Sequence, residues 1–151
     1  MKEIHLKLDS GFPYMDTDVS FEQSIEDIKK LLKKFKCDEI LTYEKDKTVR
    51  MMFKKDGVPY VIDFPVIYIY GSRTQPRLAM EVSGRVIYNE IKSSLVIAEI
   101  KSFMQAMLSY IAQPTPDGII SLGELVESQK DKIIKGQLIE LDPSKIKRII
   151  G

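Results

Sequence analysis

The clearest structural signal in this chain lies in residues 48–64, which read TVRMMFKKDGVPYVIDF. Apolar and polar side chains alternate from Thr48 to Lys55, which is the period of a strand with one buried face. Asp56-Gly57 then favours a two-residue type I′ turn, because both central positions of that turn need a positive φ. The alternation resumes from Tyr60 to Phe64. We therefore predict an antiparallel hairpin here.

Further strand signals flank this hairpin. Residues 39–44 form a strand-like run before it, which predicts a three-stranded antiparallel meander. Val66–Tyr70 is expected to extend the last strand past a kink at Pro65. Near the N-terminus, apolar residues alternate with His5 and Lys7, so we expect a short strand with one buried face.

A helix is expected to begin after Ser20. Ser20 and Gln23 have the spacing of a capping box, which satisfies free amide donors at a helix start. Apolar residues then follow at three- and four-residue spacing, at Phe21, Ile25, Ile28, Leu32 and Phe35. This pattern predicts an amphipathic helix of about four turns.

The segment from Arg77 to Ala112 has no proline and predicts a long helix. One apolar sector of its helical wheel holds Leu78, Val82, Val86, Val96, Ile97 and Ile100. A roughly opposite sector holds Met80, Ile87, Ile91 and Ala98. A helix that is apolar on two sides is expected to lie between two layers. Ser102 and Gln105 form a second capping box, which marks a point where the helix can break.

After Pro114 the chain predicts only small elements. Ser121 and Glu124 open a short helix, residues 138–141 form an extended run, and Asp142-Pro143 begins a last helical segment. The predicted fold class is α+β: an N-terminal strand and helix, a three-stranded antiparallel meander, a long two-sided helix and small C-terminal helices. We expect residues 1–126 to form a single domain and residues 127–151 to be an extension packed on it or on a partner.

Composition excludes several classes of function. The 151 residues carry 23 Lys and Arg against 22 Asp and Glu, so the chain as a whole is neither strongly basic nor strongly acidic. One cysteine and one histidine exclude a disulfide framework and an ordinary Cys/His zinc site within one chain. The N-terminus has no signal-peptide core, and no uncharged run has the length of a membrane helix. We therefore expect a cytoplasmic protein without a membrane partner.

No motif in the chain assigns a catalytic residue, a cofactor or a metal. The phosphate-binding loop, the dinucleotide fingerprint and the nucleophile elbow are all absent from the sequence. His5 is interpreted as a solvent-facing strand residue. One alternative remains open, a metal-dependent enzyme that uses the carboxylates of a loop. These are Asp9, Asp16 and Asp18, with Glu22 just inside the first helix.

Basic residues are the better indication of a function. A stripe of cations can bind phosphate, and here it consists of Arg73, Arg77, Arg85 and Lys92. Tyr68 and Tyr70 could stack bases beside it. The competing interpretation is a solvated band of mixed charge, because Glu81 and Glu99 lie on the same helical face. The lysines between residues 29 and 36 are a second basic surface with the same two interpretations.

We also predict a homodimer built on the long helix. The sector that includes Val82 and Ile97 is expected to cover the sheet. The opposite sector then needs a second cover, and it supplies the predicted interface at Met80, Ile87, Ile91 and Ala98. Two-fold pairing would bury that sector symmetrically. The alternative is that the first helix and the C-terminal segment cover it within one chain.

Residues 20–126 also carry a pattern that resembles an uncharacterised family of short proteins from bacteriophages, prophages and mobile elements. The resembling positions are Ser24-x-x-Asp27-Ile28, Phe53-x-x-x-Gly57, Arg77, Arg85-x-x-Tyr88-x-x-Ile91-Lys92, Phe103-x-x-Ala106 and Asp117-Gly118. The resemblance implies a genomic setting and no particular activity. With the basic stripe, it leads us to expect a small non-enzymatic accessory protein of phage or mobile-element DNA metabolism. Such a protein would bind nucleic acid or a replication or recombination protein, and the alternative is a purely oligomerising structural module.

Overall fold

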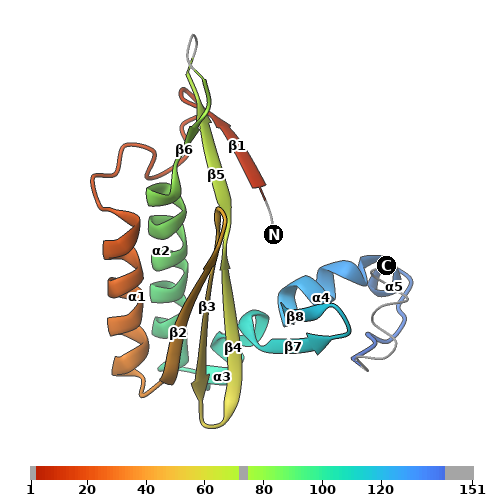
Figure 1. The fold of residues 1–151 in the computed structure, drawn as a ribbon. Coiled ribbons are helices and arrows are strands. Elements are labelled where there is room, and N and C mark those ends of the chain that lie inside the picture. The colour runs from red at the N-terminus through yellow and green to blue at the C-terminus, as the bar shows by residue number, and fades with distance from the viewer. Residues whose placement is uncertain (1–2, 72–74, 142–151) are drawn as a thin grey trace.

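The computed structural model describes residues 3–71 and 75–141, and these residues form an α+β fold as the sequence predicts (Figure 1). In chain order the elements are β1 (Glu3–Lys7), α1 (Phe21–Lys34), β2 (Asp38–Lys45), β3 (Thr48–Lys55), β4 (Val58–Phe64), β5 (Val66–Tyr70), β6 (Arg77–Leu78), α2 (Met80–Ala98), α3 (Phe103–Ala106), the 3-10 turn η1 (Leu108–Tyr110), β7 (Ala112–Thr115), β8 (Gly118–Ser121), α4 (Leu122–Ser128) and α5 (Lys130–Ile134). None of the described helices combines the length and apolarity that a membrane span requires.

The predicted meander is confirmed. β2, β3 and β4 form one antiparallel sheet in that order, which we call sheet B. Asp56 and Gly57 connect β3 to β4 with φ values of 52° and 79°. Both angles are positive, as a type I′ turn requires. The hairpin therefore follows from the local sequence alone.

The segment after Pro65 continues as a strand but changes sheet. β5 follows the line of β4 in Figure 1. It pairs in parallel with β1 and antiparallel with β6, in a second sheet that we call sheet A. The predicted extension past the kink is thus confirmed, while the pairing of the two distant strands had no local signal.

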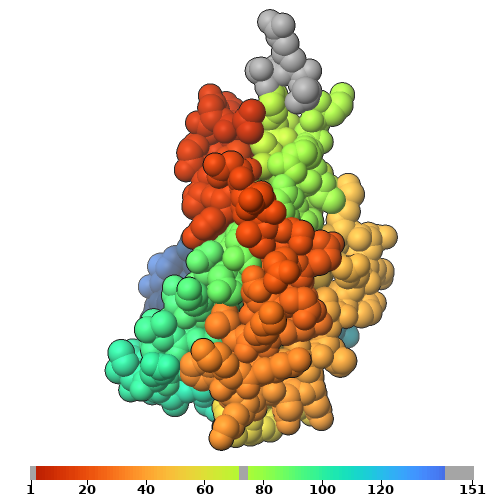
Figure 2. Space-filling model, turned by 90° about the vertical axis from the view of Figure 1, so that its left-hand side faces the viewer, coloured from red at the N-terminus to blue at the C-terminus, as the bar shows by residue number. Residues whose placement is uncertain are grey.

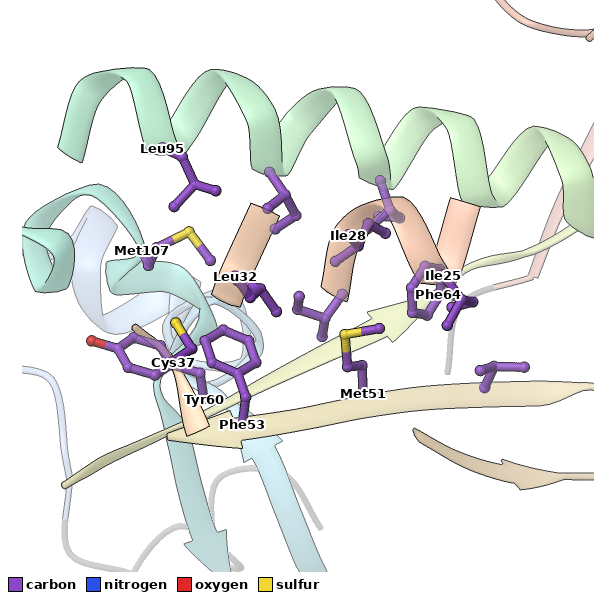
Figure 3. Packing of buried hydrophobic residues seen from close by; sticks show 14 residues of the cluster. Ile25, Ile28, Leu32, Cys37, Met51, Phe53, Tyr60, Phe64, Leu95 and Met107 are labelled. Atoms are coloured by element: carbon purple, nitrogen blue, oxygen red, sulfur yellow. The ribbon is translucent and has the colours of Figure 1, made fainter. Parts of the chain in front are cut away.

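Helices α1 and α2 lie side by side on one face of the sheets (Figure 1), and Figure 2 shows α1 in the middle of this face. The apolar stripe of α1 is confirmed, because Ile25, Ile28 and Leu32 are buried. Their side chains and that of Leu95 point toward the side chains of β3 in Figure 3. Sheet B and the two helices thus enclose one hydrophobic core.

Helix α2 was expected between two layers, but it lies beside α1 on one face of the sheets, and its two apolar sectors contact α1, sheet B and sheet A. Val82 packs in a second cluster with Ile67 and Ile69 of sheet A. Ile87 and Ile91, the predicted dimer contacts, are buried in the core of their own chain because α1 and sheet B cover them. They leave no surface for a second copy, and the predicted interface is corrected. The homodimer itself stays a prediction.

The other residues of the two apolar sectors of α2 differ in how far they are buried. Met80 packs partly buried against the same core, and Ala98 is partly buried at the end of the helix. Ile97 and Ile100 were expected to cover the sheet, but both are exposed, Ile100 to 84%. The helix ends at Ala98, well before residue 112, so Ile100 lies outside the helix whose sector was expected to carry it.

Beyond α2, the second capping box is confirmed. Ser102 accepts a hydrogen bond from the amide of Gln105, and the Gln105 side chain accepts one from the amide of Ser102. The β7–β8 hairpin that follows was not predicted. Ser121 caps α4 as expected. Residues 138–141 form no strand, and the predicted helix from Asp142 lies outside the described residues.

Gly84 lets α1 and α2 approach closely, and its replacement tests this contact. A Cβ at position 84 would lie 2.8 Å from Cβ of Ser24. Helix propensity alone would make Gly84→Ala stabilising by about 1 kcal/mol. We expect the opposite sign, a loss of about 1–3 kcal/mol in unfolding free energy by urea denaturation, because the helices must separate. Ser93→Ala on the exposed side of α2 is the control and should be slightly stabilising. A stabilised Gly84→Ala variant would contradict the close packing.

Candidate nucleic-acid interface

The structure separates the residues that the sequence placed in one nucleic-acid site. Tyr68 and Tyr70 belong to β5, and Arg77 precedes α2, which carries Arg85 and Lys92. Arg73 lies outside the described residues. Because strand side chains alternate and Ile69 faces α2, the two tyrosines point to the outer face of sheet A, away from the helices. The tyrosines and the helix cations therefore do not form one surface.

The parallel pairing of β1 with β5 completes the outer face of sheet A. It sets His5 opposite Tyr68 and Lys7 opposite Tyr70. The imidazole of His5 stacks on the ring of Tyr68, with centroids 5.3 Å apart and planes 10° apart. The Tyr70 ring lies 5.4 Å from the imidazole on a plane tilted by 39°. We call this group of three aromatic side chains the ring row.

Hydrogen bonds hold the imidazole of His5 in the ring row. Nε2 lies 2.9 Å from Oε1 of Glu3, and an ionised carboxylate can only accept a hydrogen bond. Nε2 is therefore the donor. In the neutral ring Nδ1 then accepts a hydrogen bond from the hydroxyl of Tyr70, over 2.6 Å. The sequence interpretation of His5 as a solvent-facing strand residue is confirmed, but it missed these partners.

Cations flank the ring row. Nζ of Lys47, in the turn between β2 and β3, donates a hydrogen bond of 2.7 Å to the hydroxyl of Tyr68 and lies 5.2 Å from the centroid of that ring. The hydrogen bond to Tyr68 raises the pKa of Lys47. Lys7 and Tyr70 border an open hollow of about 530 Å³, which Leu8, Asp9 and Gly71 also line. Aromatic rings beside ammonium groups can stack bases and neutralise phosphates.

Arg85 is engaged inside the protein instead of forming part of a basic stripe. Its Nε donates to Oγ of Ser24 over 2.9 Å and its Nη2 to Oδ2 of Asp27 over 2.8 Å. The guanidinium also lies 4.2 Å from the centroid of the Tyr88 ring. With 14% of its side chain exposed, Arg85 links α2 to α1. Its role in the predicted site is therefore corrected to a structural one.

The other helix cations support the competing interpretation, a band of mixed charge. Nη1 of Arg77 donates to Oε1 of Glu81, one turn along the chain, over 2.5 Å. Lys92 is exposed, with its Nζ 6.0 Å from the centroid of the Tyr88 ring. Each arginine of the stripe that the structure describes thus has a carboxylate partner.

The loop carboxylates do not gather into a metal site. Across residues 3–71 and 75–141, no group of three or more His, Cys, Asp or Glu side chains is placed to hold a metal ion. Asp9, Asp16, Asp18 and Glu22 all belong to these residues, so the metal-dependent alternative loses its proposed ligands.

Comparison with known proteins adds no relative to this description: no protein-family model, no curated protein and no solved structure matches the chain.

The two arginines form a matched pair for mutation. Arg85→Met keeps the apolar stem but removes the guanidinium donors to Ser24 and Asp27, which leaves Asp27 only the hydrogen bond from Gln23, so we expect unfolding free energy to fall by about 1.5–3 kcal/mol. Arg77→Met breaks only a surface pair between β6 and the first turn of α2, and it should cost less than about 0.5 kcal/mol. Urea denaturation at neutral pH compares them, and equal effects would contradict the linking role of Arg85.

The contribution of Arg85 should also depend on pH through Asp27. Hydrogen bonds from Gln23 and Arg85 lower the pKa of Asp27 below its ordinary value of 3.8. A lowered pKa stabilises the fold above the ordinary value, and this stability is lost as pH falls through the folded pKa. The difference in unfolding free energy between wild type and Arg85→Met should therefore shrink between about pH 7 and about pH 2.5. Urea denaturation at both pH values measures it, and a constant difference would exclude the ion pair as its source.

Proposed function

We propose that this chain is a small non-enzymatic accessory protein of phage or mobile-element DNA metabolism, and that it binds single-stranded nucleic acid on the outer face of sheet A. The observation that carries the binding proposal is the ring row of His5, Tyr68 and Tyr70 beside the Lys47 ammonium. The genomic setting rests on the sequence resemblance alone.

The ring row favours unpaired bases over a duplex. Bases within a duplex are stacked on each other and cannot stack on a side chain, whereas unpaired bases can. Every base has an aromatic face, so stacking on Tyr70 or His5 would be tolerant of sequence. The phosphates between stacked bases would then lie within reach of the ammonium groups of Lys7 and Lys47.

The charge of the chain predicts how strong this binding is. A formal net charge of +1 provides little long-range attraction for nucleic acid. Binding should therefore depend on a few local contacts, and its affinity should be modest and sensitive to salt.

Fluorescence anisotropy with a labelled oligothymidine of about 20 nucleotides tests the proposal at about 50 mM salt. Wild-type protein should bind, and Tyr70→Leu, which keeps apolar bulk but removes the ring, should weaken binding roughly 5- to 150-fold. Tyr43→Leu is the control, because Tyr43 is an exposed tyrosine of sheet B, outside the ring row. No binding by the wild type, or equal loss in both variants, would contradict the proposed site.

The salt dependence tests the cation independently. Each phosphate contact to a single strand contributes roughly 0.7 to the slope of log affinity against log salt. Lys47→Ala should reduce that slope by about this amount, while Lys34→Ala, at the exposed end of α1, should leave it unchanged. A slope that does not change in Lys47→Ala would remove Lys47 from the site.

A further inference from the structure

His5 joins the two tyrosines of the ring row, and its imidazole makes a hydrogen bond through each nitrogen. Nε2 donates to Oε1 of Glu3 over 2.9 Å, and Nδ1 lies 2.6 Å from the hydroxyl of Tyr70. The imidazole also stacks on Tyr68, whose hydroxyl accepts a hydrogen bond from Nζ of Lys47. With 47% of its side chain exposed, His5 can exchange protons with solvent. The proposed nucleic-acid site is thus built around an imidazole, the kind of side chain that changes charge near neutral pH.

Among the described residues, the titratable groups that face this imidazole come from three elements. They are Glu3 and Lys7 of β1, Tyr68 and Tyr70 of β5, and Lys47 of the turn between β2 and β3. Of side chains of these types and the imidazole itself, only the imidazole ordinarily changes charge between about pH 5 and about pH 8. A change of pH within this interval therefore acts on the ring row through the proton of His5.

The charge of the ring row depends on that proton. When His5 is neutral, the carboxylate of Glu3 is an anion on the face proposed to bind phosphates, and its side chain is 55% exposed. When His5 is protonated, Nε2 still donates to Glu3, and the two side chains form an ion pair without net charge. The repulsion between Glu3 and an approaching phosphate is then cancelled. Protonation thus favours the binding of an anion and requires no movement of any ring.

The hydroxyl of Tyr70 responds to the same proton. Nδ1 of a neutral His5 has no hydrogen here, so the Tyr70 hydroxyl donates its own hydrogen to it. Nδ1 of an imidazolium carries a hydrogen and donates it, so the hydroxyl oxygen becomes the acceptor. The hydroxyl hydrogen of Tyr70 can then point away from His5 and be donated to a phosphate oxygen. A single proton therefore removes a repulsion and adds a donor at the same place.

We propose that protonation of His5 switches the ring row into its binding form, so that single-stranded nucleic acid binds more tightly below neutral pH. This inference rests on the proposed function, because it concerns the regulation of the same site. The phosphate oxygens of the ligand sense the proton, while the bases stack on the rings at either pH. A change of one charge a few ångströms from a phosphate alters affinity about three- to ten-fold, which is the expected size of the effect.

Fluorescence anisotropy with the same labelled oligothymidine measures the switch at about pH 8 and about pH 5.5, at one salt concentration. The affinity of the wild type should rise about three- to ten-fold at the lower pH. His5→Phe keeps a ring that can stack on Tyr68 but cannot titrate, so its affinity should change less than about two-fold between the two pH values. Tyr70→Phe loses only the hydroxyl and should show a smaller rise than the wild type.

Two carboxylate variants test the role of Glu3. Glu3→Gln removes the anion, so its affinity at about pH 8 should exceed that of the wild type about three- to ten-fold. Glu26→Gln changes the net charge by the same amount at an exposed position of α1 and should leave the affinity unchanged. An equal gain in both variants would assign the effect to net charge and overturn the proposal.

Proton NMR reports the switch independently, because the chain has one histidine and therefore one imidazole Hε1 signal. Binding and protonation are reciprocal, so saturating oligothymidine should raise the midpoint pH of that signal by about 0.5–1 unit, the logarithm of the affinity ratio. Equal wild-type affinity at both pH values, or an equal rise in His5→Phe, would overturn the switch while binding itself is still observed. An absence of binding at both pH values would overturn the proposed function and the switch with it.

Discussion

A one-residue change of phase at Pro65 determines which side chains face the helices. Before it, Tyr60, Ile62 and Phe64 enter the core with α1 and α2; after it, Ile67 and Ile69 do so. Proline has no amide hydrogen to donate, so the ladder of one sheet ends there and the pairing of the next begins. A shift of one residue turns every side chain of a strand to the other face of the sheet. If the alternation continued unchanged through Pro65, the tyrosines of β5 would point at α2 and its isoleucines would point outward. The second cluster, the two-sided packing of α2 and the ring row all depend on this change.

Helix α2 shows what a helical wheel can and cannot establish. The wheel correctly indicated apolar residues on two sides, but it carries no information on which layer covers each side. Small residues determine that here, because Ser24 of α1 lies against Gly84 and brings the two helices into close contact. Arg85, one residue farther on, is thereby drawn between the helices and away from solvent. A residue that a helical wheel places on the polar face can thus be largely buried once the helix packs against its neighbour.

Local signals predicted the local structure well. The alternation of β3, the Asp56-Gly57 turn and the caps at Ser102 and Ser121 each act over a few residues, and the structure contains them all. The candidate site was predicted only in part. Tyr68 and Tyr70 do share a face, but His5 joins them through a parallel pairing across some sixty residues, which no local pattern indicates. Lys47 reaches Tyr68 from another sheet, for the same reason.

The partners of the cations explain why the outer face of sheet A, and not the helix layer, is the better surface for an anion. A phosphate near Arg85 would lie close to Asp27, whose carboxylate already neutralises the guanidinium, so the net attraction for a further anion is small. Glu81 neutralises Arg77 in the same way. Lys47 donates to the phenol of Tyr68, which is neutral, so a phosphate there adds an ion pair without breaking one. Counting basic residues along a helix therefore overestimates its affinity for nucleic acid, because it ignores the carboxylates that fold against them. A single lysine beside stacked rings retains its charge for an incoming ligand.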